Sequence, residues 1–435
     1  MPPTGQGRFR VLVIGAGIGG LGAAICLARK GHSVTVIESA RELSEVGAGI
    51  QIPPNSTRVL HSYGLTDQFL EKVVHPRNLK FRRYCTGEIL SSTPFRGVLE
   101  DKFGFPYWLI HRADYQRILF DAAQESGAKI LLGAPLEYVD QWAPAAFLLD
   151  GRRITADLII GADGIRSKTR RAVIRGKEVE PNASENSVFR VTIPAAVMHA
   201  DDQVKHLLTD MDANSWIGHR RHIMAYPIRQ GAVYNMVLAF PGQAGVGKWN
   251  EPGDPDEMRA LYANFDPLIT RVLAKVDSCL KWKLADLPPL PNWVSSSGRV
   301  VLIGDAAHAM VPYLAQGAAM AIEDGAALGE CLDRAQSVRD IPKLLRAFET
   351  IRKPRCERIQ AGAQENGYMW HLPDGQEQIA RDRALKSVSE RAEKSADWTP
   401  NKWADQEFGP WMFGYNVFDY TNAMLDVILK PQLHL

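Results

Sequence analysis

The sequence predicts an α/β fold in which a domain built on a parallel sheet is interrupted by an inserted β-rich domain and followed by a C-terminal helical tail. Two observations lead to this prediction. Short, wholly apolar runs, Val11–Ile14 and Val300–Ile303, are typical of strands buried on both faces of a parallel sheet. Between residues 178 and 283, short strands of alternating polarity are separated by turns rich in Gly, Asp and Pro. At 435 residues, the chain is long enough for two or three domains.

A glycine-rich loop follows the first apolar run and leads into a small-residue helix, Leu21–Lys30. Gly15 permits the tight turn, Gly17 lets backbone amides approach a phosphate group, and Gly20 lets the helix pack closely on the strand. The helix N-terminus presents free N–H groups and a partial positive charge to phosphates. Glu38, at the end of the second strand, is placed to accept both hydroxyls of an adenosine ribose. The pattern therefore predicts a dinucleotide-binding site.

The composition is that of an ordinary globular protein, with 46% hydrophobic residues and a net charge of +2. No basic field suggests nucleic acid, and no run of about 18 apolar residues suggests a membrane span. The five cysteines are scattered and mostly set among apolar residues, which indicates reduced thiols in a cytoplasmic protein. A secretory signal is the alternative interpretation of the N-terminus, but three glycines interrupt its apolar stretch. The first seven residues are expected to be a disordered lead-in.

The order of the remaining elements predicts that the first domain is discontinuous. Its expected elements are a glycine loop around Gly49, a helix from about Asn55, a helix over Arg112–Ala123, a strand over Ile154–Gly161, and a helix over Gly317–Leu332. Strands within Phe81–Thr93, around a Thr86–Gly87 turn, are assigned to the inserted domain. The expected boundaries are residues 1–80, 101–177 and 284–365 for the first domain, 81–100 and 178–283 for the inserted domain, and 366–435 for a charged helix (Gln376–Lys394) and an aromatic tail. The tail, which includes Trp398 and Trp403, is expected to pack over a domain or subunit face.

Three motifs together resemble the group A flavin-dependent monooxygenases, the salicylate-hydroxylase-like aromatic hydroxylases. The first is the glycine loop with Glu38, and the second is Gly161–Ser167 (GADGIRS), similar to the Asp-Gly motif of that family. The third is Gly304–His308 (GDAAH), followed by Gln316-Gly317. Many relatives have an asparagine shortly after this Gln-Gly pair, where the present chain has alanines. A single GxGxxG unit disfavours Baeyer–Villiger oxygenases, and no Trp-x-Trp-x-x-Pro halogenase signature is present.

The resemblance implies a Rossmann-type FAD-binding domain and an enzyme that takes FAD as cofactor, NADPH or NADH as transient reductant, and O2. In that family a C4a-hydroperoxyflavin transfers an OH group to an electron-rich aromatic small molecule. Arg112 matches the arginine that reaches the FAD pyrophosphate, and the Asp305 carboxylate is suited to ribityl hydroxyls. The residues expected to bind FAD are Gly15, Gly17, Gly20, Glu38, Gly49, Arg112, Asp163, Gly304, Asp305, Gly317 and Ala318. No metal ligands and no nucleic-acid partner are expected, and a homodimer is a further expectation.

The candidate catalytic residues lie on two strands of the inserted domain. Period-2 geometry places His222 and Tyr226 on one strand face, where His222 is suited to act as general base with Tyr226 relaying the proton. Arg190 is the rival, because a fixed cation stabilises a phenolate without exchanging a proton. The alternatives are that His222 and Tyr226 only contribute to packing of the sheet and that Arg190 forms a surface or interdomain salt bridge. Gln51 is a further candidate for the pocket lining.

Two other functions stay open from the sequence. The same scaffold with Arg190 as proton donor suits epoxidation of an indole or alkene, which needs no phenolate. A non-oxygenating flavin reductase or FAD-binding protein is the alternative from another class.

Overall fold

A five-stranded parallel sheet forms the centre of the first domain in the computed structural model, which describes residues 9–43, 48–174, 179–242, 251–390 and 399–430. The strand order is β18-β11-β1-β2-β7. Its strands are β1 (Arg10–Ile14), β2 (Ser33–Ile37), β7 (Lys129–Leu131), β11 (Leu158–Gly161) and β18 (Val300–Leu302). Residues Val11–Ile14 are almost fully buried, as predicted for a strand covered on both faces. The predicted N-terminal lead-in lies outside the described residues.

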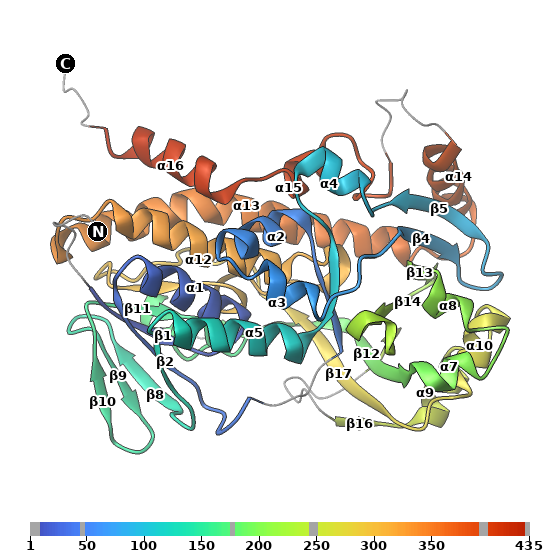
Figure 1. The fold of residues 1–435 in the computed structure, drawn as a ribbon, viewed down its shortest axis with the longest axis horizontal. Coiled ribbons are helices and arrows are strands. Elements are labelled where there is room, and N and C mark those ends of the chain that lie inside the picture. Colours follow the sequence, from blue (N-terminus) through green and yellow to red (C-terminus); the bar gives the residue numbers. More distant parts are fainter. Residues whose placement is uncertain (1–8, 44–47, 175–178, 243–250, 391–398, 431–435) are drawn as a thin grey trace.

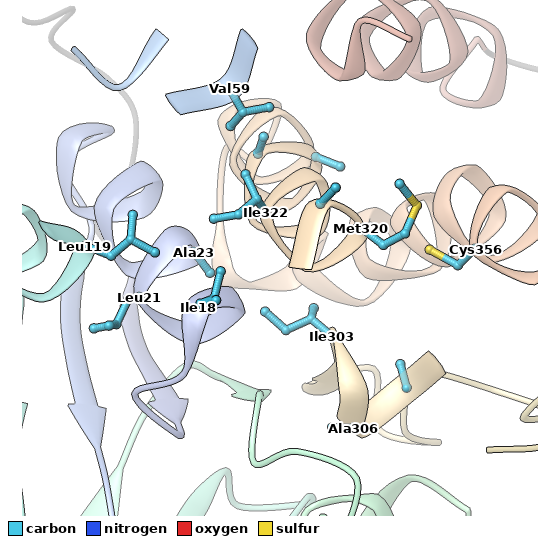
Figure 2. Close-up of a cluster of buried hydrophobic side chains, with 14 of the residues drawn as sticks. Ile18, Leu21, Ala23, Val59, Leu119, Ile303, Ala306, Met320, Ile322 and Cys356 are labelled. Atoms are coloured by element: carbon cyan, nitrogen blue, oxygen red, sulfur yellow. The ribbon is translucent and has the colours of Figure 1, made fainter. Parts of the chain in front are cut away.

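Three helices cover this sheet and pack on one another. Helix α1 (Ile18–Arg29) contacts both α5 (Arg112–Glu125) and α12 (Gly317–Asp333). Figure 2 shows apolar side chains of α1 and α12 in one buried cluster. The two helices approach closely because a Cβ on Gly325 would lie 2.7 Å from the backbone nitrogen of Ala23. The shorter helices and 3₁₀ turns around this domain are α2 (Pro54–Ser62), α3 (Thr66–Leu70), α4 (Val98–Phe103), α6 (Arg170–Val173), α11 (Asp305–His308), η2 (Pro312–Leu314) and η3 (Val338–Asp340).

The inserted domain is an eight-stranded sheet that is antiparallel except where β13 pairs with β4. In spatial order, its strands are β16 (Glu251–Gly253), β17 (Cys279–Asp286), β12 (Asn182–Pro194), β15 (Val233–Pro241), β14 (Arg221–Ile228), β13 (Ala213–Gly218), β4 (Asn78–Arg83) and β5 (Ile89–Pro94). One face carries residues such as Phe189, Val191 and Ile223, which form a core under four short helices. These helices are α7 (Ala195–His199), α8 (His206–Thr209), α9 (Pro255–Leu261) and α10 (Pro267–Leu273), and η1 (Arg229–Gly231) joins β14 to β15.

The other face of this sheet is turned toward the first domain. Val188 of β12, Ala239 of β15 and His222 of β14 lie directly opposite one another across three neighbouring strands. Met224 and Tyr226 follow on the same face and belong to the main core of the molecule. The predicted alternation is therefore confirmed. Two small sheets complete the strands: β8 (Leu136–Asp140), β9 (Ala145–Leu148) and β10 (Arg153–Thr155) form one, and β3 (Gly49–Ile52) with β6 (Trp108–His111) forms the other.

The C-terminal segment runs along the molecule from one domain to the other (Figure 1). Its helices are α13 (Ile341–Trp370), α14 (Gln376–Glu390), α15 (Phe408–Phe413) and α16 (Val417–Ile428). Helix α16 packs against α12 and α13, whereas α14 packs against β5. The ring of Trp403 stacks on Trp370, 6.0 Å between centroids, and lies 6.1 Å from the ring of Phe81 in β4. The tail therefore packs over domain faces, which is one of the two predicted alternatives. Trp398 lies outside the described residues. No helix in the described ranges is long and apolar enough to cross a bilayer.

Some predicted boundaries are wrong. The single strand expected over residues 154–161 is two strands in different sheets, because the chain turns at Asp157, whose carboxylate accepts a hydrogen bond from the Arg10 backbone N–H. The boundary at 283/284 falls inside β17, which extends to Asp286. The boundary at 365/366 falls inside α13, which continues to Trp370 and brings that ring onto Phe81 of β4. Helix α14 begins at the predicted residue and is described to residue 390.

Candidate active site

A cleft of about 810 Å³ separates the parallel sheet from the inserted sheet. Glu38, Asp163 and Asp305 line it from the first domain, each just beyond the carboxyl end of a parallel strand. Arg190 and Trp282 line it from the inserted sheet. Open parallel sheets bind ligands beyond the carboxyl ends of their strands, so the cleft is where a dinucleotide is expected.

The glycine loop has the shape that a phosphate site needs. Gly15 has φ +106°, and a Cβ there would lie 2.4 Å from the carbonyl oxygen of Ala162. A Cβ on Gly20 would lie 2.0 Å from the carbonyl oxygen of Gly15, so the first turn of α1 packs directly on the loop. A Cβ on Gly17 would meet no atom within 4 Å. Gly17 is therefore the position where the loop is open to a ligand, at the N-terminus of α1.

Glu38 holds the glycine loop as well as facing the cleft. Its Oε2 accepts a hydrogen bond from the Ala16 N–H at 2.8 Å, and its Oε1 accepts one from the Ala40 N–H at 2.9 Å. Gln116, one helical turn after Arg112, donates to the Ala16 carbonyl at 2.8 Å. Sequence reasoning missed Gln116, although its spacing of four from Arg112 places both on one face of α5.

Two charged side chains of the first domain are available to a ligand. Arg112 is exposed at the start of α5 and forms no ion pair within the described ranges. Asp305 is exposed at the cleft and has no hydrogen-bond partner among the residues that the structure describes. Gly304 before it has φ +56°, a conformation that favours glycine, and its N–H donates to the buried Asp324 carboxylate at 3.0 Å. The hydrogen bond to Asp324 thus fixes the loop, while the Asp305 carboxylate stays available to a ligand.

Asp163 has a different position from Asp305. One of its carboxylate oxygens accepts from the Ser167 hydroxyl at 2.6 Å, and the other accepts from the Thr169 N–H and hydroxyl at 3.0 Å each. These bonds tie the GADGIRS loop into a fixed turn. Asp163 therefore shapes the cleft wall, and its carboxylate is already in use.

Helix α12 packs beside the glycine loop, since a Cβ on Gly19 would lie 3.0 Å from Cβ of Ala321. Its first turn begins at Gly317 and Ala318, contains no acidic residue, and has no side-chain cap among the described residues. Gln316, buried just before it, accepts from the Asn55 side chain at 3.0 Å, whereas its Nε2 has no hydrogen-bond partner within the described part of the chain. Uncapped N–H groups and the positive end of the helix suit an anionic ring. Sequence reasoning did not assign a role to Asn55.

Gly49 and Gln51 make their contacts elsewhere. The Gly49 N–H donates to the Asn235 side chain at 2.7 Å, and a Cβ there would lie 2.5 Å from the Tyr226 ring. Gly49 thus lets β3 pack against the inserted sheet, and its neighbour Ala48 lines the cleft instead. Gln51 accepts a hydrogen bond from the Tyr107 hydroxyl at 2.7 Å.

Arg190 lies at the cleft without a carboxylate partner. Its guanidinium carbon is 3.6 Å from the centre of the Trp282 ring, and its Nε is buried with no hydrogen-bond partner in the described ranges. Burial, with a smaller contribution from Arg112, lowers the pKa of Arg190 to about 9. Tyr226 acts in the opposite direction on that pKa. The predicted alternative of a salt bridge is not observed for Arg190 among the described residues.

His222 has another partner than the one predicted. Its Nδ1 lies 2.8 Å from Nε2 of His371, and no hydrogen bond joins it to Tyr226 among the described residues. The rings of Tyr313 and Trp370 pack edge-on against His222, with centroids 5.3 and 5.0 Å away. Burial, and then His371, hold the pKa of His222 well below its usual value. The two residues are four positions apart, which corresponds to roughly 13 Å along the strand. The role of Tyr226 in relaying the proton stays a prediction.

The comparisons with known proteins agree with this site. A family model described as an FAD binding domain matches residues 8–363. The chain belongs to this family. It is 36% identical over 417 residues to the FAD-dependent monooxygenase OpS4 of Beauveria bassiana, covering 95% of this chain and 97% of the relative. It is 34% identical over 369 residues to 3-hydroxybenzoate 6-hydroxylase 1 of Aquipseudomonas alcaligenes, covering 84% and 90%.

The fold is also that of a solved hydroxylase. A salicylate hydroxylase substrate complex superposes with a TM-score of 0.78 at 23% identity, covering 98% of this chain and 99% of that one. The protein is an FAD-dependent monooxygenase with FAD as its cofactor, as its three motifs predicted. The open Gly17, the free Asp305 and Arg112, and the uncapped α12 fit that cofactor.

Proposed function

We propose that this enzyme uses NAD(P)H and O2 to hydroxylate a phenolic aromatic acid. The observation that carries the proposal is the single sheet face on which Arg190, Tyr226 and His222 are turned toward the FAD domain. That face combines a cation at the cleft with a neutral imidazole among aromatic rings. A relative at 34% identity is named for 3-hydroxybenzoate, which carries both a carboxylate and a phenol.

FAD, when bound, supplies the redox and oxygen-transfer chemistry. The residues of the chain have to bind the ring and remove the phenolic proton, because a phenol reacts better as its anion and has a pKa near 10 in water. His222 is neutral at physiological pH because its pKa is lowered, so its free ring nitrogen is able to accept that proton. Arg190 supplies a positive charge for the substrate anion.

The first test is a substrate screen. Salicylate, 3-hydroxybenzoate and 4-hydroxybenzoate are supplied with NADH or NADPH, and product mass is checked for one added oxygen atom. We expect NAD(P)H oxidation coupled to formation of an oxygenated product for at least one phenolic acid. Benzoate, the matched acid without the hydroxyl, should give no oxygenated product. Oxidation of NAD(P)H without any oxygenated product from these three acids would contradict a phenolic acid as the substrate.

A second candidate function is epoxidation of an indole or alkene. The unpartnered Nε of Arg190, with its lowered pKa, favours it, because such a cation is a candidate proton donor. Product from indole but from no phenol would support this candidate.

The roles of His222 and Arg190 are separated by their pH profiles. His222→Ala should slow single-turnover hydroxylation by about 10²–10⁴-fold, with recovery at high pH where the phenol ionises unaided. Arg190→Ala removes a cation and raises the pKa of the bound phenol, so its profile should shift to alkaline pH with a smaller loss of the plateau. Wild-type rates for His222→Ala across the whole range would eliminate it as the base.

The sequence also predicts a homodimer in the cytoplasm. Sedimentation of the purified protein and fractionation of cells from the source organism test these two predictions.

A further inference from the structure

The hydrogen-bonded pair of His222 and His371 connects the interior of the molecule with its surface. His222 is 4% exposed, whereas His371 is half-buried. The two rings are 5.0 Å apart between centroids and tilted by 32°, which leaves Nδ1 of His222 and Nε2 of His371 at 2.8 Å. Each ring therefore uses one nitrogen for the pair and keeps the other for a second partner.

The outer ring faces a cleft of its own. His371 lines a cleft of about 430 Å³, separate from the FAD cleft, together with Tyr313, Tyr368, Glu185 and Asp286. The inner ring is held between Tyr313 and Trp370, which restrict its rotation. Nε2 of His222 has no hydrogen-bond partner among the described residues. It is therefore the nitrogen left for a bound phenol.

The charges around the pair keep both rings neutral. His371 has its pKa lowered to about 4 by burial and then by three cationic or titratable groups. These groups are Arg381 of α14 and, in the turn between β13 and β14, His219 and Arg220. The acids Glu185 and Asp286 line the outer cleft with His371, and Glu185 forms an ion pair with Arg220 at 3.1 Å. Tyr313 contacts both rings. When two neutral imidazoles share one hydrogen bond, one ring donates its N–H and the other ring accepts with its unprotonated nitrogen.

The protonated form of a buried histidine with a lowered pKa is unfavourable. His222 takes the phenolic proton only if that proton leaves again quickly, since burial and the neighbouring ring both disfavour the imidazolium. Through His371, the pair reaches the outer cleft, where solvent is able to accept the proton.

We propose that His222 and His371 form a proton relay that carries the phenolic proton from the substrate to solvent in the outer cleft. The relay rests on the proposed function of His222 as base. The substrate O–H bond breaks and the proton joins Nε2 of His222, while the Nδ1–H proton of His222 moves to Nε2 of His371. The Nδ1–H proton of His371 passes to water. When the product anion is protonated, the same movements run in reverse and restore both tautomers. His371 is thus a positioning and relay residue that does not touch the substrate.

The test follows ionisation of a bound phenol directly. The probe is 3-hydroxy-4-nitrobenzoate, whose phenolate is yellow, bound to the FAD-loaded enzyme and ionised by a stopped-flow pH jump. His371→Gln keeps a hydrogen-bonding group near Nε2 but cannot pass a proton on, and it should slow ionisation by about 10²-fold. The pKa of the bound probe and its affinity should stay close to those of the wild type. His219→Gln, which changes an exposed histidine near the pair, should leave the rate unchanged.

Rescue and isotope effects distinguish a relay from a structural role. His371→Ala leaves space for free imidazole, and added imidazole should restore the ionisation rate in that variant only. In the wild type, the rate in H2O–D2O mixtures should curve with deuterium fraction, because more than one proton moves.

The outcomes separate the relay from the function on which it rests. Fast ionisation in both His371 variants, with slow ionisation in His222→Ala, overturns the relay and leaves His222 as base. Fast ionisation in both His371 variants and in His222→Ala also overturns the role of His222 as base. A linear isotope dependence in the wild type, or a slow His371→Ala that imidazole does not restore, also counts against the relay. If the wild type binds the probe without ionising it, the proposed function of His222 as base for a phenol is contradicted.

Discussion

Glu38 does two tasks with one carboxylate. Both oxygens are hydrogen-bonded to backbone N–H groups that flank the phosphate loop and the end of β2, and the group still faces the FAD cleft. A carboxylate that accepts from Ala16 and Ala40 fixes the loop before any ligand arrives. We therefore expect ligand affinity to depend on Glu38 through loop geometry as well as through the predicted contact with the ribose.

Glu38→Ala should weaken FAD binding. Loss of a charged hydrogen-bond acceptor costs about 1.5–3 kcal/mol, which is about tenfold to hundredfold in the Kd. Glu42→Ala is the matched control, because Glu42 is an exposed acid on the same loop. The measurement is fluorescence titration of apoprotein with FAD. Equal affinities for both variants would contradict the assignment of Glu38.

Asp305→Ala should yield folded protein that retains little FAD. The carboxylate is exposed at the cleft and holds no other part of the described structure, so its loss should leave the melting temperature of the apoprotein unchanged. Asp305→Asn keeps one acceptor oxygen without the charge and should bind FAD with intermediate affinity. If Asp305→Ala kept full FAD with a normal flavin spectrum, the Gly-Asp motif would have another role.

The residues proposed for the FAD site could be named from the sequence because each belongs to a short motif whose chemistry is local. Gly15 directly follows β1, Gly20 lies in the first turn of α1, and Asp305 follows β18. His371 could not be predicted, since it meets His222 across 149 residues of chain. The strand period gives the face of His222 but says nothing about which residue packs against that face.

At the scale of elements, the contact between α1 and α12 depends on glycines. Gly325 of α12 lies so close to α1 that a Cβ would be 2.7 Å from the Ala23 nitrogen, and a Cβ on Gly22 of α1 would lie 2.7 Å from Cδ1 of Ile322. The two backbones approach closely at these glycines, and apolar side chains such as Ile322 fill the rest of the contact. The contact therefore ties the helix behind the phosphate loop directly to the helix whose first turn is Gly317.

Gly325→Ala and Gly17→Ala should separate packing from binding. Gly325→Ala forces the two helices apart, and overpacking of this kind costs about 1–3 kcal/mol of stability. Gly17→Ala meets no protein atom, so the apoprotein should keep its stability while FAD binding is lost. Denaturant unfolding of both apoproteins, beside FAD titration, measures the two effects. A destabilised Gly17→Ala protein would mean that the loop is not open there.

Elements with one strong period were predicted well, and elements that depend on distant partners were not. Residues 33–37 and 222–226 lie in strands as expected. The run 154–161 reads as one apolar strand, although its two halves pair in different sheets. The long helix α13 was not predicted, and Pro354 lies in its interior, where sequence rules place a helix end.

At the scale of the whole molecule, a buried ionic cluster joins segments from both ends of the chain. Glu323 of α12 accepts hydrogen bonds from Arg352 and Arg355 of α13 at 2.6 to 2.9 Å, and from Asn55 of α2 at 2.7 Å. Arg355 also donates to the carbonyl of Met412 in α15. The cluster thus fixes α12, whose N-terminus faces the FAD site, to the C-terminal segment.

Glu323→Gln should destabilise the protein much more than Glu330→Gln on the same helix. Removing the buried charge leaves Arg352 and Arg355 short of a counter-ion, and breaking such a buried pair costs about 3–5 kcal/mol. Glu330 pairs with Lys30 at 3.0 Å in a partly exposed position, where loss of a pair costs about 0–1 kcal/mol. Urea unfolding of the FAD-free proteins at neutral pH measures both differences.

The pH dependence of the stability difference between the wild type and Glu323→Gln identifies the cause of that difference. The two arginines hold the pKa of Glu323 below its usual value of 4.5 despite its burial. Its ionisation therefore stabilises the folded protein above pH 4.5, and this contribution is lost as the pH falls through the lowered pKa. Glu323→Gln has no such contribution to lose, so the gap between wild type and variant should narrow in acid. Asp324, whose pKa is lowered in the same direction, shares Arg352 with Glu323 and titrates in both proteins. A gap that stays constant from neutral to strongly acidic pH would assign the loss to packing and not to the buried charge.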